Sequence, residues 1–275
     1  MGTHLQAAVW NNTRAWTPKY QAEYRKWVRD NLRPDFFVKS SSRAYQGLVL
    51  DCADTVYTIR AIYAFENGLP FRFRDPSNST RLISNDMTRF DAIADPELRM
   101  RAFLKYLYGV VSTKSIPNDT YPAAMNRDAI GPGSVISTDA ANHHSWTIWR
   151  LDRMGVTELL FSSRPAKSML FYRKGYPSTG FMFPNGNTLQ SNAGFRNFRR
   201  DEDLLKSVVE VEGFSMDQYN VPLARWHKTM QSRISLDQES NVERFVRLVD
   251  DSCAGAKERT VFVNDGLRYR RSIAA

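Results

Sequence analysis

Cysteine and histidine are scarce in this chain of 275 residues, which contains two cysteines and four histidines. Two cysteines cannot build a disulfide framework, and the lack of a C-x-x-C pair argues against a structural zinc site. No apolar run approaches the roughly 18 residues that a transmembrane helix needs. Hydrophobic residues (42%) and aromatic residues (12%) are nevertheless frequent enough for a folded core, which excludes a disordered chain. The length fits one elaborated domain or two modest ones.

Acidic residues are the minority among the charges, with 38 Lys and Arg against 29 Asp and Glu and a net charge of +9. The basic residues are scattered, and the densest groups, at 196–200 and 268–271, are short. This pattern is typical of a solvated cationic surface. Attraction to an anionic polymer such as a bacterial cell wall stays open, whereas we do not expect a nucleic-acid partner.

The start of the chain, Met1–Gln6, is typical of an expression-vector remnant and includes His4. We therefore assign 1–16 to this remnant and an N-terminal tail. No apolar signal-peptide core is visible, as expected when a signal peptide has been removed, so we expect an exported protein, periplasmic or extracellular. The histidines that remain for chemistry are His143, His144 and His227.

Helix signals dominate the first part of the chain. Thr17 and Pro18 form a capped helix start. Asn67 and Gly68 give a later helix its left-handed C-terminal cap. The predicted helices are 17–31, 53–66 and 96–111, and the polar stretch 72–91 is predicted to be a loop.

Strand signals follow in the middle of the chain, and helix signals return after it. The short β-type runs are 134–137, 145–151 and 156–161, and the last two are joined by a turn that ends in Gly155. We predict a long surface loop at 176–194, then helical segments at 204–209, 222–230 and 242–249. The order of helices, strands and helices indicates an α+β fold.

Cys52 is the first candidate for chemistry because it lies at the start of a predicted helix, directly after Asp51. The positive end of the helix dipole lowers the pKa of a thiol there, which is what a cysteine nucleophile requires. The alternative is a buried structural cysteine, since free cysteine is among the most buried residue types. Gln46, six residues earlier, carries a side-chain amide that can donate to an oxyanion.

His143 and His144 are the candidates for the general base. Neighbouring residues of a strand face opposite ways, so only one of the two can point at the thiol. His144 shares a face with Trp146 and Ile148, which look like core, and we therefore favour His144 and keep His143 as the alternate. Neighbouring strand residues cannot chelate one ion from one face, so we expect no metal and no other cofactor.

The third catalytic position is the residue that would orient the histidine. A hairpin centred between Arg153 and Met154 places Ser163 opposite His144, and a shift of one residue places Ser162 there. A hydroxyl orients an imidazole more weakly than a carboxylate does.

Two short segments resemble a known family. The run Asp-Cys-Ala-Asp-Thr-Val-Tyr at 51–57, followed by Asn-Gly-Leu-Pro at 67–70, is similar to the nucleophile helix of NlpC/P60-type cell-wall peptidases. Pro-Gly-Ser-Val at 132–135, ahead of His144, is similar to their Pro-Gly strand and following His strand. The Gln-Gly pair before the cysteine resembles papain, and the His-Ser-Trp run resembles transglutaminase-like proteins.

The resemblance covers 43–71 and 130–165 and implies a papain-like core, with a nucleophile helix packed on an antiparallel sheet. The sequence departs from the pattern where Asp54 replaces a glycine and Ser134 replaces an aspartate, and where serine takes the third catalytic position. The long gap between cysteine and histidine implies an insertion at about 72–129. We accordingly predict a catalytic domain at 17–175 and a loop with a C-terminal helical extension at 176–275.

Three functional hypotheses follow. The first, implied by the resemblance, is a cysteine amidase or peptidase that acts through a thioester on peptidoglycan peptide bonds. The second is transglutaminase-like acyl transfer to an amine. The third is a catalytically decayed module of the same fold that binds cell wall or protein. Cys253 follows two aspartates and is interpreted as structural, and a disulfide between it and Cys52 in an oxidising compartment stays open.

Overall fold

The computed structural model describes residues 8–138, 144–175 and 193–273. Its helices are α1 (Pro18–Asn31), α2 (Phe36–Lys39), α3 (Cys52–Asn67), α4 (Pro96–Tyr108), α5 (Ile116–Asp119), α7 (Trp226–Ile234) and α8 (Asn241–Ile273). Its strands are β1 (Arg72–Asp75), β2 (Asn78–Ser84), β3 (Thr120–Pro122), β4 (Val135–Ser137), β5 (Ser145–Leu151), β6 (Thr157–Phe161), β7 (Phe171–Lys174) and β8 (Gly194–Phe198). The α+β class predicted from the sequence is confirmed.

The described strands form a six-stranded antiparallel sheet in the order β3-β8-β4-β5-β6-β7 and a separate hairpin of β1 and β2. The predicted hairpin of β5 and β6 is confirmed, and a β-bulge between Ile148 and Arg150 shifts its register by one residue. β8 lies between β3 and β4, so a segment that the sequence analysis assigned to the C-terminal extension belongs to the sheet.

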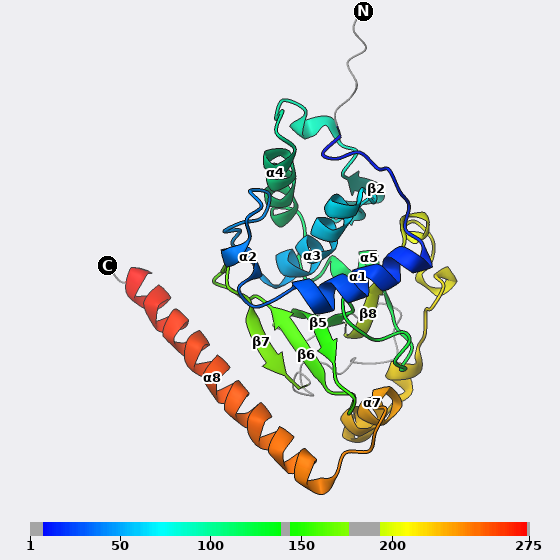
Figure 1. Cartoon of the computed structure of the whole chain (residues 1–275), viewed down its shortest axis with the longest axis vertical. Coiled ribbons are helices and arrows are strands. Elements are labelled where there is room, and N and C mark those ends of the chain that lie inside the picture. The colour runs from blue at the N-terminus through cyan, green and yellow to red at the C-terminus, as the bar shows by residue number, and fades with distance from the viewer. Residues whose placement is uncertain (1–7, 139–143, 176–192, 274–275) are drawn as a thin grey trace, which may run out of the picture.

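α3 is the central helix of the molecule, and its ends are fixed by local sequence. The Asp51 side chain accepts from the N–H groups of Ala53 and Asp54, and the Asp54 side chain accepts from the N–H of Asp51, which completes a capping box. Gly68 closes the helix in the left-handed conformation, with φ of 61°. The helix is buried from Cys52 to Ala64 because α1, α4 and the sheet surround it (Figure 1).

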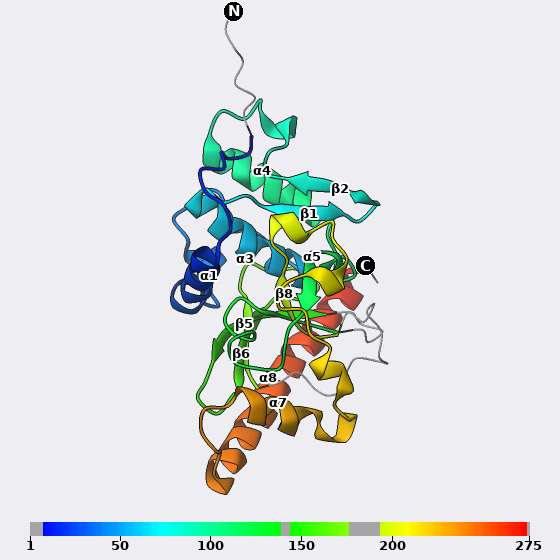
Figure 2. The same ribbon diagram turned by 90° about the vertical axis from the view of Figure 1, so that its right-hand side faces the viewer.

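The two faces of the sheet pack into different cores. The face that carries Val135, Trp149 and Leu160 packs with α1, α3 and α4. The other face carries the side chains that alternate with these, and it packs against α7, where Trp226 stacks on Phe195 with ring centroids 5.8 Å apart. Figure 2 shows α1 and α3 on one side of the sheet and α7 on the other.

Arg60 is buried inside the core on α3, which is unusual for a charged side chain. Its guanidinium lies 3.3 Å from the ring centroid of Trp16 and 4.6 Å from that of Tyr24. Burial lowers the pKa of Arg60 to about 10. The side chain also donates to Gln21, so the rings and this amide replace the water that the charge has lost.

The N-terminal tail predicted at 1–16 is wrong for its described part, because Val9, Trp10 and Trp16 are buried. The indole N–H of Trp10 donates to the carbonyl of Leu69, and that of Trp16 donates to the carbonyl of Pro70. Residues 8–16 therefore pack along the end of α3 as part of the core.

Three other predictions are also corrected. The stretch 72–91, predicted as a loop, contains the β1–β2 hairpin, in which Phe73 and Ile83 pair and are buried. The predicted helical segment 204–209 and the start of the predicted segment 222–230 lie in a series of 3-10 turns, and α7 begins only at Trp226. The final helix extends far beyond the predicted 242–249, since α8 contains 33 residues.

Candidate functional site

Cys52 is the first residue of α3 and is 9% exposed. Its sulfur lies 3.4 Å from the hydroxyl oxygen of Thr113, and the backbone N–H groups of Ala53 and Ser145 lie near enough to lower the pKa of the thiol. Ser145 begins β5, so the sulfur sits where the central helix meets the start of a central strand. The predicted placement of a cysteine at the N-terminus of a helix packed on an antiparallel sheet is confirmed.

The expected lowering of the Cys52 pKa is wrong. Burial raises the pKa of this thiol, and the charge of Asp51 raises it further. The hydrogen bond with Thr113 and the two backbone N–H groups act in the opposite direction, because they stabilise the thiolate. Desolvation is the largest of these effects and outweighs the hydrogen bonds, so Cys52 is a neutral thiol at neutral pH.

Buried hydroxyl groups lie on the face of the sheet that α3 covers. Ser145 and Thr147 alternate along β5 on this face, and Ser137 of β4 pairs with Ser145 in the register. All three are at most 2% exposed, and their hydroxyl oxygens have no hydrogen-bond partner among the described residues. A polar ligand or an ordered water beside Cys52 would satisfy them.

His144 packs on the opposite face of the sheet. Its ring lies 4.3 Å from that of Trp146 and 5.5 Å from that of Phe161, measured between centroids. The reason for preferring His144 is therefore wrong: the face of Trp146 and Ile148 is core, but α7 covers it and α3 does not. Within the described residues, no hydrogen bond joins His144 to Cys52. The alternate base, His143, lies outside the described residues.

Burial lowers the pKa of His144 to about 4, and the negative charge of Asp51 opposes this shift only weakly. The imidazole is therefore neutral at physiological pH and is able to accept a proton. The influence of Asp51 also indicates that His144 lies near the cap of α3, at the same end of the sheet as Cys52.

The two serines proposed as orienting residues occupy different environments. Thr147 of β5 pairs with Leu160 of β6. If this pairing continued past the ends of the two strands, Ser163 would lie opposite His144, as predicted. Ser162 is fully buried, and its hydroxyl donates to the carbonyl of Leu50 at 2.6 Å. Ser162 therefore holds the segment that leads into α3, whereas Ser163 is partly exposed.

Gln46 is exposed in the turn before α3. Its backbone N–H donates to the carbonyl of Ser42, and its own carbonyl accepts from Arg101. In the described part of the chain no hydrogen bond brings its side-chain amide to Cys52. The proposed role of Gln46 as an oxyanion donor is therefore not supported by a contact.

Thr113 and Arg164 belong to this region and were not singled out in the sequence. Thr113 follows α4 in a turn, 61 residues from Cys52, so no local pattern could connect the two. The guanidinium of Arg164 is 87% exposed and lies 3.3 Å from the carboxylate of Asp51, beside the entrance to α3. The pKa of Asp54 is raised to about 7, mainly by burial.

Lys167 connects this region with α8. Its backbone exchanges two hydrogen bonds with Leu50, which precedes the cap of α3. Its ammonium group forms an ion pair with Asp265 on α8. An open cavity of about 530 Å³ lies alongside and is lined by Arg164, Pro165 and four residues of α8.

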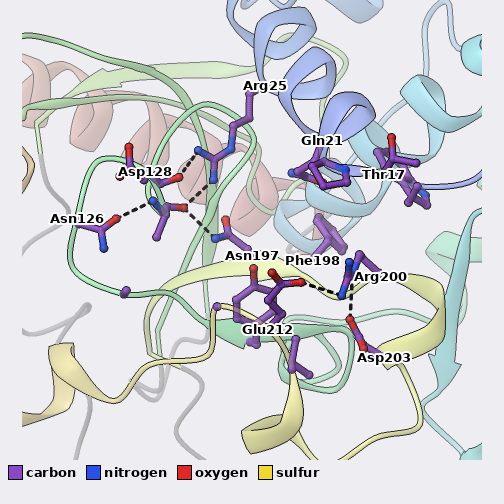
Figure 3. Close-up of a pocket in the computed structure, with 17 residues that line it drawn as sticks. Thr17, Gln21, Arg25, Asn126, Asp128, Asn197, Phe198, Arg200, Asp203 and Glu212 are labelled. Atoms are coloured by element: carbon purple, nitrogen blue, oxygen red, sulfur yellow. Dashed lines mark hydrogen bonds and ion pairs between the residues drawn. The ribbon is translucent and has the colours of Figure 1, made fainter.

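A second cavity of about 390 Å³ opens at the other end of the sheet, between α1 and the end of β8 (Figure 3). Arg25 reaches across it to the carbonyls of Asp128 and Ala129. Arg200 forms ion pairs with acidic neighbours that include Glu212. Because these guanidinium groups already have protein partners, their charges are balanced within the protein.

Further chemical features are few. No group of three or more His, Cys, Asp or Glu side chains suited to a metal ion occurs among the described residues. None of the described helices combines the length and apolar character needed to cross a bilayer. Both cysteines are free thiols, and Cys253 is exposed on α8.

Comparisons with known proteins give no relative from which a role could be transferred. No protein-family model, no curated protein and no solved structure matches this chain.

Proposed function

We propose that this protein is a cysteine amidase or peptidase with a papain-like arrangement of helix and sheet. The observation that carries the proposal is the position of Cys52 at the first residue of the central helix, with its sulfur against the start of β5. Nucleophilic cysteines need a helix N-terminus, nearby N–H donors and a histidine within reach. The NlpC/P60-like segments around residues 51–57 and 132–135 support the same assignment.

The reaction would proceed through a thioester. A histidine takes the proton from the Cys52 thiol, and the sulfur attacks the carbonyl carbon of an amide to form a tetrahedral oxyanion. The histidine then gives the proton to the departing amine as the carbon–nitrogen bond breaks. Water attacks the thioester, releases the carboxylic acid and restores the thiol. We assign the oxyanion donor to the backbone N–H of Ser145, because this group lowers the pKa of the neighbouring thiol.

A raised thiol pKa makes the base essential, because little thiolate exists at neutral pH without it. His144 is neutral and near the cap of α3, but its ring packs on the far face of the sheet. His143, outside the described residues, is the second candidate. The two histidines are therefore to be tested side by side.

The substrate we propose is a peptide bond in a peptidoglycan stem. The net charge of +9 would favour an anionic wall polymer, and the resemblance points to wall peptidases. Papain-like proteins that resolve the thioester with an amine carry out acyl transfer, and the His-Ser-Trp run at 144–146 keeps this outcome within the proposal. Added glycine ethyl ester would appear in the product only if transfer occurs.

The second candidate function is a binding module that has lost catalysis. Three observations favour it: the raised pKa of Cys52, the packing of His144 away from α3, and the engagement of Ser162 by Leu50. Such a module would retain affinity for the wall polymer and would not form a thioester.

Digestion of purified peptidoglycan, followed by mass spectrometry of the released fragments, tests the proposal. We expect cleavage by the unchanged protein and by Cys253→Ala, and none by Cys52→Ala. The variants His143→Ala and His144→Ala identify the base as the one whose loss abolishes cleavage. Equal cleavage by Cys52→Ala would refute the proposal. Wall binding without cleavage by any variant would establish the binding module.

A further inference from the structure

Within the described residues, the long C-terminal helix α8 contacts the body of the protein along one face. Phe262 packs on Phe171 of β7 with ring centroids 5.3 Å apart, and Asp265 forms the ion pair with Lys167. Asp251 lies against the backbone of Gly175 at the end of β7. Residues 251 and 265 are separated by two heptads, so a single line along the helix faces the body. Figure 1 shows α8 as a straight rod that extends past β7 at both ends.

The opposite face of α8 carries an exposed apolar seam. Its large members are 45–73% exposed: Val242, Val246, Val249, Val263 and Leu267. Exposed Cys253 and Ala256 continue it through the middle of the helix. The positions 242, 246, 249, 253, 256, 260, 263 and 267 alternate in steps of four and three residues, which is the spacing of a coiled-coil seam. The seam is about 38 Å long at 1.5 Å per residue.

The charged residues beside the seam indicate which partner helix would fit it. On one side of it the helix carries Glu243 and Asp250 in its first half, and Lys257 and Arg271 in its second half. A flank that is acidic at one end and basic at the other is complementary to the same flank of an antiparallel copy. A parallel copy brings no opposite charges together across the seam, because the neighbours of Asp250 and Lys257 would then be Phe245 and Ser252.

We propose that α8 pairs with α8 of a second copy of this chain as an antiparallel two-helix coiled coil. The register that matches the charges places Cys253 opposite Ala256 of the second copy and Asp250 opposite Lys257 of the second copy. Both contacts occur twice because the dimer has twofold symmetry. A register shifted by one heptad would bring Lys257 onto Lys257 and is disfavoured. This inference does not depend on the chemistry proposed for Cys52.

Light scattering coupled to size-exclusion chromatography of the full chain gives the first test. We expect a mass of twice 31.6 kDa at micromolar concentrations. Val249→Asp places a charge in the seam and should weaken the dimer at least tenfold, whereas Leu248→Asp, at a neighbouring exposed position outside the seam, should not. Far-UV circular dichroism of both variants verifies that α8 stays folded. A monomeric chain, or equal behaviour of the two variants, overturns the proposal.

A charge swap tests the orientation. Asp250→Lys should weaken the dimer, and adding Lys257→Asp to it should restore the dimer, because both opposite-charge contacts are rebuilt with reversed sign. A role of Asp250 confined to its own helix would give no such restoration. Loss without restoration overturns the antiparallel register.

Disulfide trapping tests the same register by a covalent route. In a Cys52→Ser background, Ala256→Cys should give a disulfide-linked dimer under mild oxidation, since residues 253 and 256 of the two copies face each other. Cys253 alone should react slowly, because the two Cys253 residues lie in different layers of the seam. Rapid crosslinking through Cys253 alone would show a parallel pair and would overturn the proposal.

Discussion

The buried carboxyl group of Asp119 should make the stability of this protein fall as the pH rises. Asp119 is 1% exposed at the end of α5, where it accepts hydrogen bonds from the backbone N–H of Arg74 and from the hydroxyl of Tyr57 on α3. Burial raises its pKa to about 7 in spite of both hydrogen bonds. The folded state therefore holds a proton that the unfolded state, with a pKa near 3.8, has already released.

The magnitude follows from these two pKa values. Relative to a group that stays neutral, the raised pKa of Asp119 lowers the free energy of unfolding by roughly 2 kcal/mol at pH 5 and roughly 4 kcal/mol at pH 8. Because the pKa is raised in the folded state, the loss of stability is absent below pH 3.8. It grows as the pH rises from 3.8 to 7 and is constant above that range. Asp119→Asn keeps the shape and the acceptor toward Arg74 and cannot ionise.

Urea unfolding followed by tryptophan fluorescence at pH 5 and pH 8 measures the effect. We expect the free energy of unfolding of Asp119→Asn, relative to the unchanged protein, to rise by roughly 2–3 kcal/mol between the two pH values. Asp54 and Asp201 also have raised pKa values, but they contribute equally to both proteins and cancel in this difference. A difference that does not vary with pH would refute the reasoning.

Four further predictions concern single sites. His144, with its pKa lowered to about 4, should show no NMR titration between pH 5 and 8, and a midpoint near 6.5 would contradict its burial. Gly155→Ala should destabilise the protein by about 2 kcal/mol in thermal unfolding, because φ is +73° and the new methyl would meet the α7 backbone at 2.9 Å. Gly255→Ala, in open space on α8, should instead stabilise it by about 0.5–1 kcal/mol. Thr113→Val should slow alkylation of Cys52 by iodoacetamide about tenfold at pH 8, because the thiolate loses a hydrogen bond; an unchanged rate would exclude that role.

Features encoded in adjacent residues were predictable from the sequence. The capping box of Asp51 and Asp54 and the left-handed cap at Gly68 act within one turn of α3, so its ends were predicted to within a residue. The hairpin of β5 and β6 was found for the same reason, since its turn and its alternation are local.

Features that depend on distant partners were missed. β8 is stabilised by β3 and β4, which lie far from it in the chain, and its own pattern is dominated by Gly194 and Arg196. The alternation of side chains along the strand showed that His144 and Trp146 lie on the same face of the sheet. It could not show which of the two faces α3 covers. The pKa of Cys52 was predicted from the helix dipole alone. The effect of burial could not be included, because burial depends on the whole fold.

The position of Lys167 has a mechanical consequence. The backbone of this residue is hydrogen-bonded to the segment that precedes α3, and its side chain forms an ion pair with α8. A force or a displacement applied to α8 is therefore transmitted over a short, stiff path to Leu50, two residues before Cys52. A partner that displaces α8 would therefore act on the segment that positions the thiol.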